Sequence, residues 1–153
     1  MLSKLKVAFD DPEHGWVGLT ISRGDESVTI NASYTPRDSF LDLTDALHNL
    51  FLYGGGVKVT WHSGSAEYEL RFAKEGGLVR FEAYDYPDHL RDAGKGQLFF
   101  EASGTFEGIC LPFWRALRNL QGRFSEAELN ARWHRPFPSK EIDDLTALLR
   151  DGR

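Results

Sequence analysis

Alternating hydrophobic and polar positions open the chain, and the same pattern occurs twice more before residue 35. A period of two is typical of strands that bury one face. The three runs cover residues 4–9, 17–21 and 28–34. Aspartate, proline and glycine lie between the first two runs, and glycine and acidic residues lie between the next two, so both gaps predict turns. We therefore expect three short strands joined as an antiparallel meander.

The period becomes helical in the next segment. Between residues 40 and 51 the hydrophobic side chains recur at steps of three and four, which predicts an amphipathic helix. Ser39 followed by Asp42 resembles a capping pair, so Ser39 is the expected N-cap. The three glycines at 54–56 are expected to end the helix.

A second set of alternating runs follows this helix, over residues 57–61, 68–72 and 79–83, and a further strand is expected at 98–102. One face of these strands is apolar. The other face carries Lys58, Thr60, His62, Glu67, Glu69, Arg71, Arg80 and Glu82. Mixed charges in this pattern favour a sheet face in contact with solvent. The predicted fold class is α+β, with an antiparallel meander sheet of about 6–7 strands and helices packed on one face.

The chain beyond residue 104 is predicted to be helical. Helical spacing runs from 106 to 120, and Pro112 predicts that a helix starts or kinks beside it. Ser125 and the glutamate three residues later form a capping box for a short helix that ends near Trp133. Ser139 is the expected cap of the last helix. Short C-terminal helices over residues 125–150 should therefore close the fold.

An internal duplication is also predicted. A shift of 70 residues aligns 28–50 with 98–120 at eight identities, where chance gives roughly one or two. The repeat halves would be about 4–54 and 78–122, each a meander followed by a helix. The hairpin at 57–73 would then be an insertion between them. At 153 residues, the whole chain has the length of one domain, 1–153.

Composition indicates a soluble protein of a bacterial-type cytoplasm. No apolar run approaches the ~20 residues that a membrane span needs. The alternating N-terminus lacks the apolar block of a secretory signal. Cys110 is the only cysteine, which excludes an intramolecular disulfide and fits a reducing compartment. Its apolar neighbours predict a buried, inert thiol.

Arginine and tryptophan are concentrated in one segment of this acidic chain. The net charge of −5 argues against binding to nucleic acid. Residues 113–135 nevertheless hold five arginines and only two glutamates. The residue types favoured in protein interfaces are Trp114, Arg115, Arg118, Trp133, His134 and Arg135. They predict a surface for a protein partner of acidic character. In the alternative, the tryptophans cover the core while the arginines extend over it into water.

Two loops share the pattern Asp-x-Pro-acid-His and offer candidate metal ligands. These ligands are Asp10, Glu13, His14, Asp85, Asp88 and His89. Carboxylate and imidazole groups bind divalent cations. The alternative is turn chemistry, in which aspartate and proline shape the loop and the acid and histidine are merely exposed. Because no metal signature of recognised spacing is present, no metal or cofactor is predicted.

Acid–base chemistry would need His62 beside Glu67, Glu69 or Tyr84 on the polar sheet face. No nucleophile elbow, phosphate-binding glycine loop or zinc-protease motif accompanies these residues. The function predicted from sequence is therefore a protein-interaction module, of the general type of bacterial accessory or immunity proteins, acting through the arginine and tryptophan segment. The alternative is a metal-dependent hydrolase or small-ligand-binding domain built on the two loops. The sequence leaves the oligomeric state open.

Overall fold

The computed structural model describes residues 4–64, 66–87 and 96–152. Within these residues, seven strands form one antiparallel sheet whose spatial order follows the chain. The strands are β1 (Leu5–Phe9), β2 (Trp16–Arg23), β3 (Glu26–Ser33), β4 (Gly55–Ser63), β5 (Ala66–Glu75), β6 (Leu78–Tyr86) and β7 (Gln97–Gly104). The α+β class and the antiparallel meander predicted from the periodicity are confirmed.

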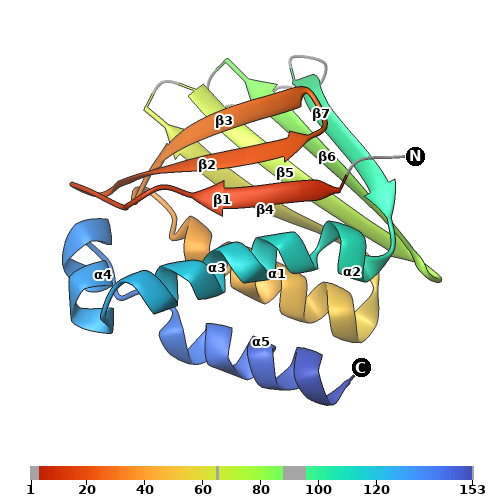
Figure 1. The fold of residues 1–153 in the computed structure, drawn as a ribbon. Helices are drawn as coiled ribbons and strands as arrows, with labels where there is room; N and C mark the ends of the chain where they lie inside the picture. Colours follow the sequence, from red (N-terminus) through yellow and green to blue (C-terminus); the bar gives the residue numbers. More distant parts are fainter. Residues whose placement is uncertain (1–3, 65, 88–95, 153) are drawn as a thin grey trace.

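The helices cover one face of this sheet, as predicted. They are α1 (Ser39–Tyr53), α2 (Phe106–Ile109), α3 (Leu111–Arg123), α4 (Glu126–Trp133) and α5 (Ser139–Asp151). Helix α1 packs on β4 and α3 packs on β1, while α5 lies against both helices on their side away from the sheet (Figure 1). In the described part of the chain, no helix has the length and apolar character that crossing a membrane requires.

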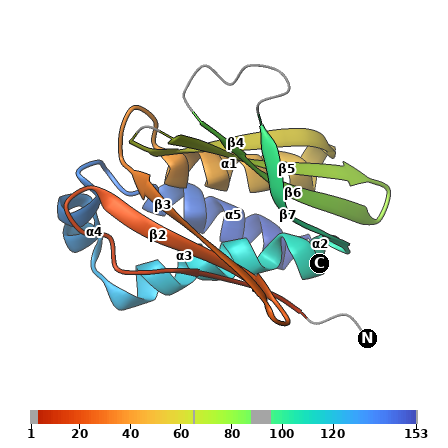
Figure 2. The same cartoon turned by 90° about the horizontal axis from the view of Figure 1, so that it is seen from above.

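The sheet is bent between β3 and β4. Strands β1–β3 pair along their lengths, and so do β4–β7, but the two groups are joined only through Ser33 and His62 in the described residues. Seen from above, the groups diverge from this junction (Figure 2). The start of β1 and the end of β7 therefore lie at the same end of the molecule, beside α2 (Figure 1). Two segments about 100 residues apart in sequence meet there.

Buried side chains from all seven strands and from the helices form the core. Its aromatic centre is Phe40, which has no exposed surface. Ring centroids of four other aromatic residues lie 4.7–5.9 Å from the Phe40 ring. These residues are Phe9, Trp61, Trp133 and Phe137. One side chain of α1 thus connects β1, β4, α4 and the segment before α5.

The predicted caps of two helices are each one residue late. Asp38, not Ser39, is the N-cap of α1, and its Oδ1 accepts a hydrogen bond from the backbone N–H of Leu41 at 3.2 Å. Ser39 begins the helix, and its buried hydroxyl donates to the carbonyl oxygen of Thr60. Pro138 likewise precedes α5, and Ser139 is the first helical residue and makes no capping bond. In both cases the serine lies inside the helix that it was expected to cap.

The other predicted helix boundaries are confirmed. Gly54 ends α1 in a left-handed conformation (φ 69°) and donates its N–H to Leu50. Pro112 lies in the first turn of α3, just after the separate short helix α2. Ser125 and Glu128 form the complete capping box of α4. The internal duplication and the division into halves stay predictions.

Candidate functional site

The polar face of β4–β6 is not solvated at its centre, so that part of the prediction is wrong. The side chains of Glu67 and Glu69 are only 3% and 4% exposed. His62 Nδ1 lies 3.0 Å from Glu67 Oε1, which confirms that the two are neighbours. Arg71 Nη2 donates to Glu69 Oε2 at 3.2 Å and to the Tyr86 hydroxyl at 2.9 Å. We call these five residues the polar cluster.

The polar cluster links three neighbouring strands through its own charges. The Arg71 guanidinium also lies 3.9 Å above the Tyr84 ring, a cation–π contact. A buried carboxylate is tolerated when a cation and hydrogen bonds compensate for its lost hydration. Glu69 receives that compensation from Arg71 and from Lys58 of β4, whose Nζ lies 3.6 Å from Glu69 Oε1, and Glu67 lies against His62. This arrangement favours a structural role.

The two tryptophans of the predicted binding surface cover the core. Trp133 has no exposed surface and donates its Nε1–H to Asp38 Oδ1 at 3.3 Å. Trp114 is half-buried and donates its Nε1–H to the hydroxyl of Thr146 in α5 at 2.9 Å. The interface prediction is wrong for Trp133, because a partner cannot reach an enclosed ring. The alternative, that these side chains complete the core, describes them better.

Two of the predicted arginines bind within the molecule. Arg118 donates to Gln121 Oε1 at 3.0 Å, within α3. Arg135 donates to the carbonyl oxygens of Tyr34 and Pro36, at 2.5 and 3.1 Å. Arg115 and His134 are the exposed members of the predicted set.

The first Asp-x-Pro-acid-His loop is held by backbone and arginine contacts. Asp10 Oδ1 accepts the N–H of Gly18 at 2.7 Å. Asp11 pairs with Arg123 of α3, and Glu13 lies 3.4 Å from Arg132 of α4. The carboxylates therefore fasten the loop between β1 and β2 to the helices, as the turn interpretation of this loop implies.

Two histidines from separate predictions line one cavity of about 300 Å³. These are His14, proposed as a metal ligand, and His134, proposed as an interface residue; Glu13 lines the same cavity. Both histidines have left-handed backbones, at φ 54° and 65°. Among residues 4–64, 66–87 and 96–152, no three side chains of metal-ligating type converge on one point.

The second loop is only partly described. Asp85 is half-buried near the end of β6, opposite Tyr68 of β5. Asp88 and His89, the other two candidate ligands of this loop, lie outside the described residues. The metal hypothesis for this loop stays a prediction.

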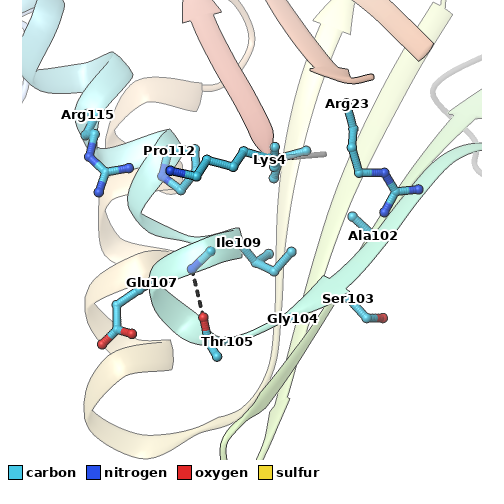
Figure 3. Close-up of a pocket in the computed structure, with 12 residues that line it drawn as sticks. Lys4, Arg23, Ala102, Ser103, Gly104, Thr105, Glu107, Ile109, Pro112 and Arg115 are labelled. Atoms are coloured by element: carbon cyan, nitrogen blue, oxygen red, sulfur yellow. Dashed lines mark hydrogen bonds between the residues drawn. The ribbon is translucent and has the colours of Figure 1, made fainter. Parts of the chain in front are cut away.

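A cavity that the sequence does not predict opens between the start of β1 and the end of β7. Its volume is about 390 Å³. Lys4 extends across it toward Pro112, Arg23 lies on the β2 side, and Arg115 projects from α3 (Figure 3). Because its charged residues are mostly cations, we call it the basic cleft. Its residues of interest are Lys4, Arg23, Ala102, Gly104, Glu107 and Arg115.

Positive charge in the basic cleft exceeds negative charge. Among the described residues, three cations line it, and Glu107 is the only acidic residue that does. Lys4 and Arg115 form no ion pair with any residue that the structure describes. Arg23 lies 3.9 Å from Glu26 in the adjoining turn, a loose pair. Within the described part of the chain, two cations of the cleft therefore have no carboxylate partner, on a protein whose net charge is −5.

Arg115 is the only charged residue of the cleft that sequence analysis selected. Lys4 immediately precedes β1 and Arg23 ends β2, where charged residues are ordinary and carry no signal. The bend of the sheet brings these positions beside α2 and α3. Lys4 and Arg23 could be selected only if the sequence also predicted that the start of β1 lies close to the end of β7.

Cys110 lies at the junction of α2 and α3, and it is buried as predicted. Burial raises the pKa of its thiol to about 12. We expect the folded protein to react with a disulfide reagent at pH 8 far more slowly than free cysteine, because roughly one thiol in ten thousand is then ionised. Absorbance of the released thiolate measures this rate, and unfolding in urea should restore a fast reaction. A fast reaction of the folded protein would contradict the burial.

Comparisons with known proteins add little to this geometry. No protein-family model matches the chain, and no curated protein matches it. Among solved structures, a chain of the CdiA-CT/CdiI toxin and immunity complex from Enterobacter cloacae is similar, with a TM-score of 0.46 and 11% identity. The match covers 76% of this chain and 96% of that chain. A similarity of this size carries no argument about function.

Proposed function

We propose that the protein is a protein-interaction module that binds an acidic segment of a partner protein in the basic cleft. The observation that carries the proposal is the pair of cations, Lys4 and Arg115, that face a cavity without a carboxylate partner among the described residues. Arginine and lysine bind carboxylates by charge-assisted hydrogen bonds. An acidic side chain that enters the cleft can therefore form such bonds with Lys4 and Arg115.

The size and setting of the cleft support the same proposal. Its volume of about 390 Å³ lies within the usual range for binding sites and admits a few side chains. The positive charge of the cleft attracts an acidic partner during approach, and the negative charge on the rest of the molecule repels that partner from other surfaces. Both effects favour one docking position.

The alternative of a hydrolase on the Asp-x-Pro-acid-His loops receives less support. Asp10 accepts a backbone hydrogen bond, and Asp11 and Glu13 each face an arginine. The arginines beside Asp11 and Glu13 already place positive charge there, which disfavours a bound cation. The polar cluster likewise places Glu67 beside His62 and Glu69 beside Arg71.

Charge reversal in the cleft tests the proposal. The probe is a fluorescent, end-capped octapeptide of alternating glutamate and threonine, and the variant carries Lys4→Glu and Arg115→Glu. Wild type should bind with a dissociation constant below about 1 mM at low salt, and the variant should bind roughly tenfold more weakly, since two attractions become repulsions. Fluorescence anisotropy measures both values.

Arg150→Glu provides the matched control. Arg150 is exposed near the end of α5 and does not line the cleft, so this variant should bind the peptide nearly as tightly as wild type. Failure of wild type to bind the peptide would overturn the proposal. Equal affinities for wild type and the Lys4/Arg115 variant would overturn it as well, and so would an equal loss with Arg150→Glu.

A further inference from the structure

We infer that the acidic segment binds as an added β-strand along the free edge of β7. This inference rests on the proposed function and adds the conformation and residue pattern of the ligand. It follows from three observations: the state of the two sheet edges, the position of the cleft beside β7, and the placement of charge on the two faces of that strand.

The edge of β7 lacks most of the devices that prevent strand addition. Among the described residues β7 is hydrogen-bonded to β6 alone, so a row of backbone N–H and C=O groups faces outward. Its sequence QLFFEASG contains neither proline nor lysine, and Leu98 is 44% exposed. The opposite edge, β1, packs against α3 and carries Lys6. Strand addition is therefore expected at β7.

The basic cleft lies beside the last part of β7. Ala102 and Gly104 pair with the buried residues Phe81 and Val79, so they belong to the inner face of the strand. Both residues are small and line the cleft. An added strand would direct alternate side chains to this inner side, since successive residues of a strand point to opposite faces. Those side chains would enter the space that Lys4 and Arg115 border.

The inner face of β7 favours acidic side chains on the added strand, whereas its outer face disfavours them. Glu101 is exposed there, between the inner positions Ala102 and Phe100. Like charges on neighbouring strands of one face are destabilising. The ligand is therefore expected to carry acidic residues at alternate positions and neutral residues between them. This pattern distinguishes an extended strand from an acidic helix, whose charges would recur at three or four residues.

Backbone methylation of the peptide tests strand addition without altering the protein. In an extended chain the N–H groups of alternate residues point to the same edge. One analogue of the glutamate–threonine octapeptide carries N-methyl groups on the glutamates, and a second carries them on the threonines. One analogue should bind roughly tenfold more weakly than the parent, because it loses several hydrogen bonds to β7. The other, blocked only on its far edge, should bind like the parent.

The outcomes separate this inference from the proposed function. Equal binding of all three peptides, or an equal loss with both analogues, would overturn strand addition. If the parent peptide still depended on Lys4 and Arg115 in that case, the basic cleft would remain the binding site. If the parent peptide bound without any dependence on those residues, the proposed function would itself be wrong. A short carboxylate such as glutarate, competing as well as the octapeptide, would show a small-anion site and overturn both.

Discussion

Replacing Trp133 with alanine is expected to lower the free energy of unfolding by about 3–5 kcal/mol. The indole is fully buried at the end of α4, and its ring centroid lies 4.7 Å from that of Phe40. Its Nε1–H donates to Asp38, the N-cap of α1. The substitution therefore opens a large cavity and removes a hydrogen bond at a helix end. Urea unfolding followed by circular dichroism measures the loss.

Trp133→Phe is the matched control for this experiment. It keeps an aromatic ring against Phe40 but removes the donor to Asp38, so it should cost clearly less than alanine. A loss below about 1 kcal/mol for Trp133→Ala would indicate a side chain at the surface. That result would restore the interface role that the sequence suggested.

Replacing Phe40 with alanine is expected to cost about as much, 3–5 kcal/mol. The Phe40 ring contacts four other aromatic rings, and well-oriented aromatic pairs contribute beyond the area that they bury. The double variant with Trp133→Ala should lose less than the sum of the single losses, because the two rings share one contact. Denaturant unfolding of the four proteins gives this coupling energy.

An exposed aromatic residue of the same helix serves as the control for Phe40. Tyr53 is 80% exposed, and Tyr53→Ala should change the free energy of unfolding by no more than about 0.5 kcal/mol. Strict additivity of the Phe40 and Trp133 losses would show that the two rings do not share one packing unit.

The order and type of the main elements could be predicted because each contains a clear hydrophobic period. Residues 4–9 alternate and contain β1, and the helical spacing of residues 40–51 lies within α1. The caps were harder, since Asp38 and Ser39 are both good N-cap types. Their roles depend on a tertiary contact, the bond from Ser39 to Thr60 in β4. Sequence spacing does not contain that information.

The role of the arginines could not be predicted from local sequence. Arg123 donates to the carbonyl oxygen of Phe9, and Arg135 donates to that of Tyr34, each about 100 residues away. Composition identified an arginine-rich segment but not the backbone acceptors that it meets. The same limit applies to Glu67 and Glu69: alternation places them on the polar face of β5 but does not reveal that they are buried.

The basic cleft depends even more on long-range structure. Arg115 could be selected from sequence as a binding residue, but Lys4 and Arg23 could not. They join it only because the sheet bends between β3 and β4 and brings both ends of the sheet to α2. Periodicity gives the local elements, whereas the site depends on the curvature of the sheet.

Binding of an acidic segment in the basic cleft is tested most directly by nuclear magnetic resonance. The glutamate–threonine octapeptide is titrated into ¹⁵N-labelled protein, and the amide chemical shifts are followed. We expect the largest changes at residues 4–6 and 102–105, with smaller ones at Arg115. Changes confined to the cavity of His14 and His134, or to the polar cluster, would contradict binding in the cleft.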